Sequence, residues 1–167
     1  YGNPRIVYRN LGNGRFEDVS ALAGDGVAQL RSSRGAAFGD YDNDGDVDVL
    51  VMNMGDRPSL LRNDLSGTNN WLKIKLQGSR SNRNAIGSNV TVVAQGRSQI
   101  QPVLSQSSFI SQNDLRLHFG LGEAKSVDRI VVRWPSGERE EFPGTGSNTT
   151  LLLVEGSGET KPIPTTK

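Results

Sequence analysis

The sequence of 167 residues contains no cysteine, which excludes disulfide bonds, thiolate metal sites and cysteine nucleophiles. Its single histidine, His118, leaves few ways to build a histidine-based catalytic centre. There are 19 lysines and arginines against 18 aspartates and glutamates, so the formal net charge is +1. This balance gives no basic excess for binding nucleic acid or an anionic membrane. No apolar stretch approaches the roughly 20 residues that span a bilayer, so no membrane insertion is expected.

Turn-forming residues are plentiful instead. The chain has 20 glycines, and asparagine, aspartate and serine are frequent. Long helical patterns are scarce, whereas short β-branched or alternating runs recur between turn signals. The clearest hairpin signal is Asn13-Gly14, because a type I′ turn needs positive φ at both central residues. The expected fold class is therefore all-β.

The pattern of strands predicts two parts joined near residues 64–70 (DLSGTNN). In the second part, residues 71–77 (WLKIKLQ) alternate, with Leu72 and Ile74 on one face and Lys73 and Lys75 on the other. Its many short strands predict a β-sandwich. Strands are expected at 5–9, 15–19, 35–40, 47–53, 58–64, 71–77, 89–95, 98–103, 115–120, 128–134, 138–142 and 150–155.

One short stretch, residues 39–49 (GDYDNDGDVDV), carries an aspartate at every second position. Like charges this close repel one another, so the loop either stays solvated or holds a cation. Ca²⁺ takes about six to eight oxygen ligands, and a tight loop can supply them from alternate side chains and one carbonyl. The pattern favours a structural Ca²⁺ site over a solvated turn. The predicted ligands are Asp40, Asp42, Asp44, Asp46 through its carbonyl, and Asp48.

The acidic loop differs from an EF-hand. Gly45 occupies the sixth position, where the chain must turn sharply, but the twelfth position holds Val51 instead of glutamate. Strands, not helices, are expected on both sides. Mg²⁺ fits less well because it keeps its waters and needs fewer carboxylates. A catalytic metal would need an open position and a neighbouring base, which the sequence does not clearly supply.

The stretches RGAAFGDYDNDGDVDVLVMN (34–53) and YRNLGNGRFEDVSALAG (8–24) resemble an FG-GAP/VCBS repeat of the integrin-type β-propeller. The second part resembles an ASPIC/UnbV domain, and the order of the two is similar to that in the cartilage acidic protein family. Ser88-Asn89 and Gln106 depart from the common pattern at single loop positions. The stretches that carry the second resemblance are 70–92, 107–124 and 127–137.

The resemblance implies a propeller-blade-like repeat over 1–66, a β-sandwich-like domain over 67–155 and a flexible tail over 156–167. It also implies Ca²⁺ binding by the acidic loop and a non-enzymatic role outside the cell or on a bacterial cell surface. Adhesion, matrix assembly or protein–protein contact is the expected role, with a protein or glycan as partner. A propeller needs several blades, so we expect the C-terminal part of a larger or multi-subunit protein, with self-association through β edges.

Two other interpretations rest on particular side chains. A carbohydrate-binding accessory module would need Trp71 or Trp134 exposed as a stacking platform, and the polar loop at 78–87 could bind sugar hydroxyls. An enzyme would have to use His118, which lies between apolar residues of a predicted strand and is expected to be structural. No G-x-S-x-G motif accompanies it, so no catalytic residue is assigned.

Overall fold

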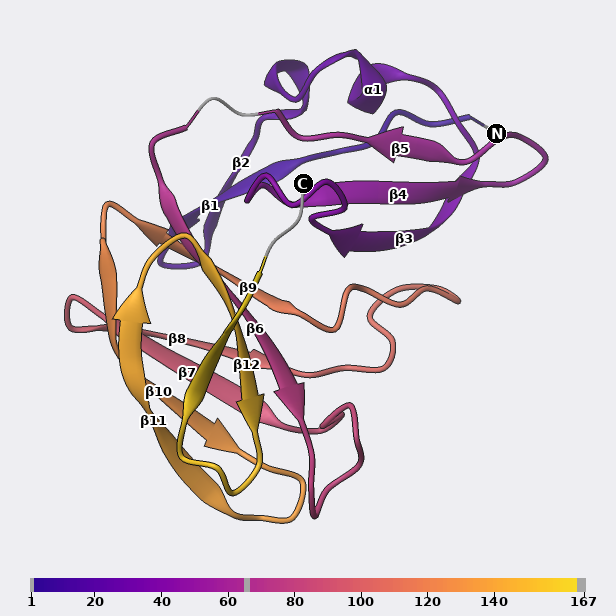
Figure 1. The fold of residues 1–167 in the computed structure, drawn as a ribbon. Helices are drawn as coiled ribbons and strands as arrows, with labels where there is room; N and C mark the ends of the chain where they lie inside the picture. The colour runs from indigo at the N-terminus through magenta and orange to yellow at the C-terminus, as the bar shows by residue number, and fades with distance from the viewer. Residues whose placement is uncertain (1, 65–66, 165–167) are drawn as a thin grey trace.

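The structure, a computed structural model, describes residues 2–64 and 67–164. These residues form an all-β fold in two parts, which confirms the predicted fold class (Figure 1). The N-terminal part contains β1 (Tyr8–Gly12), β2 (Arg15–Asp18), the 3₁₀ turn η1 (Ser20–Leu22), α1 (Asp25–Ala28), β3 (Ser33–Gly39), β4 (Asp48–Asn53) and β5 (Ser59–Leu61). The C-terminal part contains β6 (Asn70–Gln77), β7 (Asn89–Ala94), β8 (Arg97–Pro102), β9 (Leu117–Gly122), β10 (Ser126–Arg133), β11 (Arg139–Gly146), β12 (Thr149–Val154) and β13 (Thr160–Ile163).

The N-terminal part consists of the β1-β2 hairpin and a three-stranded antiparallel sheet in the order β3-β4-β5. Asn13 and Gly14 have φ values of 51° and 72°, as the predicted type I′ turn requires. The acidic loop connects β3 to β4. Among the described residues of this part, only Val27 and Val51 are buried hydrophobic side chains, so it has little core of its own.

The C-terminal part is a sandwich of two four-stranded sheets, in the orders β11-β10-β7-β8 and β13-β12-β6-β9. Alternate residues of their strands point inward, as the pattern of 71–77 predicts for Leu72 and Ile74. The core also takes in Trp134, which is 2% exposed. Its fully covered side chains include Leu72, Ile74, Val90, Phe119, Ile130, Val132, Leu151 and Leu153.

The C-terminal end differs from the flexible tail expected over 156–167. Residues 160–163 form β13, which pairs antiparallel with β12. Without this strand, β12 would be the edge of its sheet and would leave a row of backbone groups unpaired. Of the expected tail, residues 165–167 lie outside the described residues.

The two parts meet along the edge of β3. A loop of the sandwich runs beside this strand: the Asp114 amide donates to the Phe38 carbonyl (2.9 Å), and the Phe38 amide donates to Asn113 Oδ1 (3.1 Å). The Ala36 amide donates to Ser108 Oγ (3.3 Å). The edge of β3 is therefore capped within the chain, and self-association through other β edges stays a prediction.

None of the described helices is long and apolar enough to cross a membrane.

Candidate metal site at the interface of the two parts

The acidic loop folds back on itself because its carboxylates accept hydrogen bonds from its own backbone. The Gly45 amide donates to Asp40 Oδ2 (2.9 Å), and the Tyr41 amide donates to Asp48 Oδ2 (3.1 Å). The Asn63 amide, beyond β5, donates to Asp48 Oδ1 (2.8 Å). These bonds turn the side chains inward and bring residues at both ends of the loop together.

Three carboxylates gather inside the loop. One oxygen each of Asp40, Asp42 and Asp48 lies within 4.8 Å of the others, and Asp40 and Asp48 are only 3% and 2% exposed. Asp40 Oδ1 and Asp42 Oδ1 are buried without a hydrogen-bond partner in the described part of the chain. Buried polar atoms are nearly always satisfied, and a bare buried carboxylate oxygen is costly. This donor set suits a hard cation such as Ca²⁺.

Asp44 and Asp46 do not belong to that group of three. Asp44 is exposed, and its Oδ1 accepts the Asp46 amide at 2.9 Å. Burial, together with the neighbouring charges of Asp44 and Asp40, raises the pKa of Asp46 above its ordinary value. Carboxylate repulsion within the loop is therefore felt at Asp46. Asp44 and the Asp46 carbonyl stay predicted ligands.

Lys73 supplies a positive charge from the other part of the chain. Its Nζ lies 2.5 Å from Asp40 Oδ2, and the two side chains are 2% and 1% exposed. The same ammonium lies 4.7 Å from the centroid of the Trp71 ring. The strand pattern placed Lys73 on the face of β6 opposite Leu72, but the pattern could not show that the acidic loop covers this face. Asp40 thus takes part in the loop, the interface and the carboxylate group at once.

Two further basic residues of the sandwich bind the loop backbone. Arg116 donates to the Asp40 carbonyl (3.1 Å) and to Asn43 Oδ1 (2.8 Å), and it also pairs with Asp114. His118 Nε2 donates to the Gly45 carbonyl at 2.8 Å. Together with Lys73, these two side chains hold the loop from the sandwich. The contacts of His118 are structural, as its position in a predicted strand indicates.

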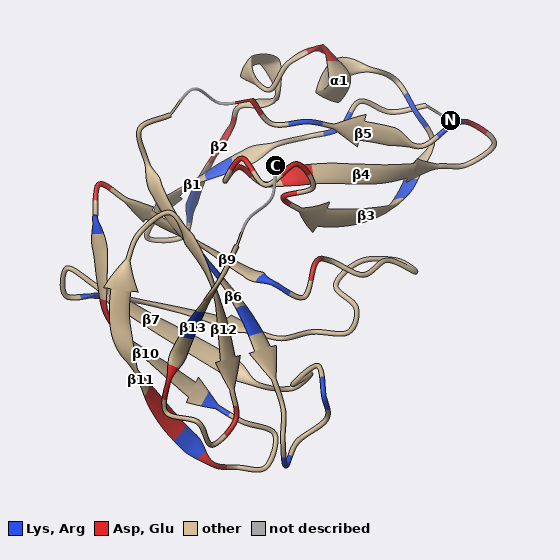
Figure 2. Ribbon diagram, in the orientation of Figure 1, with Lys and Arg blue, Asp and Glu red and all other residues tan. Residues whose placement is uncertain are grey.

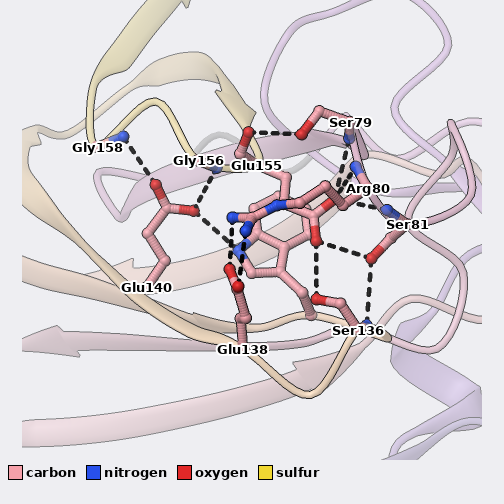
Figure 3. Close-up of polar contacts among 10 residues, drawn as sticks. Ser79, Arg80, Ser81, Ser136, Glu138, Glu140, Glu155, Gly156 and Gly158 are labelled. Atoms are coloured by element: carbon pink, nitrogen blue, oxygen red, sulfur yellow. Dashed lines mark hydrogen bonds and ion pairs between the residues drawn. The ribbon is translucent and has the colours of Figure 1, made fainter.

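Sequence reasoning missed a further buried acid, Glu155, which is 3% exposed (Figure 3). Its Oε2 accepts the amides of Ser79, Arg80 and Ser81 at 2.9, 2.8 and 2.7 Å. Its Oε1 accepts the hydroxyls of Ser81 (2.8 Å) and Ser136 (2.9 Å). Both oxygens are fully engaged, so Glu155 organises the polar loop that begins at residue 78. Only its place directly after an apolar strand could have hinted at this.

The stability of the chain is expected to depend on pH through Glu155. Burial alone raises the pKa of this carboxyl, but the amides and hydroxyls around it lower the pKa from 4.5 to about 2. Since the folded pKa is the lower one, the stabilisation is complete above about pH 4.5 and is lost as the pH falls towards 2. We expect Glu155→Gln to lower the free energy of unfolding by about 1–3 kcal/mol at pH 7. The difference in this free energy between the variant and wild type should narrow as the pH falls.

Urea unfolding between pH 7 and pH 2 measures this gap. Glu123→Gln, at an exposed position, is the matched control and should follow wild type throughout. A constant gap between Glu155→Gln and wild type across this range would contradict the assignment.

The tryptophans do not form an exposed platform. Trp134 lies in the core, where its Nε1 donates to Glu140 Oε2 (3.0 Å). Trp71 is half-buried at the interface and stacks on His118 with ring centroids 6.2 Å apart. In the polar loop, Arg80 is paired with Glu138. The carbohydrate-binding interpretation based on these tryptophans is therefore not supported by their positions.

Comparison with known families gives two matches in the order that the sequence predicts. The family described as FG-GAP-like repeat matches residues 1–51, which contain β1 to β3, the whole acidic loop and the first part of β4. The family described as ASPIC and UnbV matches residues 78–160, which cover most of the sandwich. A comparison with curated proteins found no match.

Proposed function

Because this chain joins an FG-GAP-like repeat to an ASPIC and UnbV domain, we propose that it is a Ca²⁺-dependent, non-enzymatic β module for assembly outside the cell. Both domains are typical of extracellular and cell-surface proteins and are generally non-catalytic. In the proposed role, the cation stabilises the N-terminal part and holds it against the sandwich. The function then depends on the surfaces that this arrangement presents to a partner.

The observation that carries the proposal is the pair of unpartnered buried oxygens, Asp40 Oδ1 and Asp42 Oδ1, beside Asp48. Lys73 balances one of these charges, so the group still carries excess negative charge. A bound Ca²⁺ would neutralise that excess and would replace the missing hydrogen bonds with ion–oxygen contacts. Asp44 and the Asp46 carbonyl are the proposed remaining ligands.

The need for such an ion follows from the weak core of the N-terminal part. Of the two buried apolar side chains among the described residues of this part, Val27 lies in α1 and Val51 in the sheet β3-β4-β5, so this sheet gains little from hydrophobic burial. One face of this sheet also stays apolar and open: Leu50 pairs with Leu60, and they are 43% and 51% exposed, beside Met52 at 49%. A neighbouring blade or a protein partner is the proposed cover for this face, in keeping with assembly or adhesion.

Calorimetric titration of the chelator-stripped chain tests the proposal. We expect one Ca²⁺ to bind per chain, Mg²⁺ to bind more weakly, and saturation at 100 times Kd to stabilise the fold by about 2.7 kcal/mol. Asp42→Asn should weaken Ca²⁺ binding by about tenfold or more, since it removes a ligand charge without disturbing the Lys73 pair. Asp25→Asn, at an exposed acid outside the loop, is the matched control.

Two results would count against the proposal. One is the absence of both binding heat and thermal stabilisation at millimolar Ca²⁺. The other is equal Ca²⁺ affinity in wild type and in the Asp42→Asn variant.

A further inference from the structure

The outer face of the sheet β11-β10-β7-β8 gathers three arginines. Ile130 and Val132 of β10 point into the core, so Arg129, Val131 and Arg133 point outward. The strand register places Arg139 of β11 directly opposite Arg133. Figure 2 shows the basic segments at the adjoining ends of β10 and β11. We call Arg129, Arg133 and Arg139 the arginine face.

No ion pair within the described chain neutralises the arginine face. All three side chains are exposed, and no described carboxylate lies within 4.0 Å of their charged groups, although Glu141 of the same face is near in register. Like charges opposite each other on neighbouring strands destabilise a sheet. Five arginines elsewhere each pair with a carboxylate: Arg9, Arg31, Arg62, Arg80 and Arg116. The arginine face differs from the remaining arginines because the strand register brings two of its members, Arg133 and Arg139, directly opposite each other.

The arginine face lines one side of a shallow hollow whose other lining residues are neutral. Ile100, on the edge strand β8, is 66% exposed there. The other lining residues are Asn89, Thr91, Val93, Ser98 and Val131.

We propose that the arginine face binds an anionic polysaccharide. Residues opposite each other on paired strands are about 5 Å apart, whereas four residues along a strand span about 13 Å. One small anion most readily bridges Arg133 and Arg139, which face each other, whereas Arg129 lies four residues along β10. A ligand with repeated anionic groups engages all three guanidinium groups best. Guanidinium groups bind carboxylate and sulfate through paired hydrogen bonds.

The neutral lining favours a sugar chain over other polyanions. Asn89, Thr91 and Ser98 offer amide and hydroxyl partners for sugar hydroxyls, and Ile100 offers apolar surface for the C–H face of a ring. Among the residues that the structure describes, no aromatic side chain lines the hollow, whereas single-stranded nucleic acid is bound by stacking on aromatics. The acidic loop contacts β6 and β9 of the other sheet, so this site does not depend on the proposed Ca²⁺ site.

Binding of the full chain to immobilised polysaccharides tests the proposal. The probes are a sulfated chain (heparin), a carboxylated chain (polygalacturonate) and neutral dextran. We expect salt-sensitive binding to at least one anionic chain and none to dextran, and the preference between sulfate and carboxylate identifies the anion. The triple variant Arg129→Gln, Arg133→Gln, Arg139→Gln should bind about tenfold or more weakly, because it loses three charge-assisted contacts.

The matched control changes net charge equally at exposed arginines elsewhere: Arg15→Gln, Arg57→Gln, Arg83→Gln. It should bind like wild type. The arginine-face variant should melt no lower than wild type, because it removes the Arg133–Arg139 repulsion. Binding to neither anionic chain, equal losses in both triple variants, or tighter binding to single-stranded DNA or phosphatidylserine vesicles would each overturn the proposal.

Discussion

Replacing Lys73 by methionine is expected to destabilise the chain by about 3–5 kcal/mol at pH 7 without divalent cations, because the buried Asp40 carboxylate loses its counter-charge. The methylene stem of Lys73 is retained in shape, so lost packing contributes little. Asp40 would remain beside Asp42 and Asp48 with only the Gly45 amide as donor. Urea unfolding of chelator-treated protein measures the difference.

Two variants separate the charge effect from a packing effect. Lys75→Met, two residues along β6 at an exposed position, should stay within about 0.5 kcal/mol of wild type. The pair Lys73→Met with Asp40→Asn should recover part of the loss, because position 40 then no longer holds a buried charge without a counter-charge. Saturating Ca²⁺ should stabilise Lys73→Met more than wild type, since the ion replaces the missing positive charge. A loss below about 1 kcal/mol in Lys73→Met would show that Asp40 does not depend on the ammonium.

Replacing Gly45 by alanine is the second large effect that we expect, at about 3–5 kcal/mol. Gly45 has a φ of +105°, where a side chain costs about 1–3 kcal/mol. A Cβ at this position would also overlap the Trp71 indole across the interface, and such overpacking costs about 1–3 kcal/mol more. The loop cannot retreat from Trp71 without breaking the His118 contact to the Gly45 carbonyl.

Gly55→Ala is the matched control for the backbone cost. Gly55 has a φ of +70°, but no atom lies within 4 Å of a Cβ built there. Gly55→Ala should therefore lower the free energy of unfolding by about 1 kcal/mol, the conformational cost alone. Adding Trp71→Ala to Gly45→Ala removes the overlap, and a double-mutant cycle should show coupling of about 1–3 kcal/mol. Equal losses in Gly45→Ala and Gly55→Ala would mean that the loop does not press against the indole.

Local signals were enough to predict much of the fold. Asn13-Gly14 specified its turn because a type I′ turn demands positive φ, which few residue types adopt readily. The alternation of 71–77 predicted the inward face of β6 because side chains along a strand alternate between its faces. The exception at the end of the chain, β13, had no such signal. Its pairing satisfies the edge of β12, which is a long-range requirement.

The sequence by itself determined that five aspartates at alternate positions, with Gly45 among them, form a crowded loop with too much negative charge. Charge and turn geometry are local properties, so one short stretch of chain is enough to express them. Only the tertiary structure decided which basic side chains bind that loop. Lys73 and His118 reach it from β6 and β9 of another sheet, and Arg116 reaches it from the bend just before β9. Glu155 collects amide donors from residues more than 70 positions away. Such partners are selected by packing, because burial makes an unpaired charge costly wherever its partner lies in the sequence.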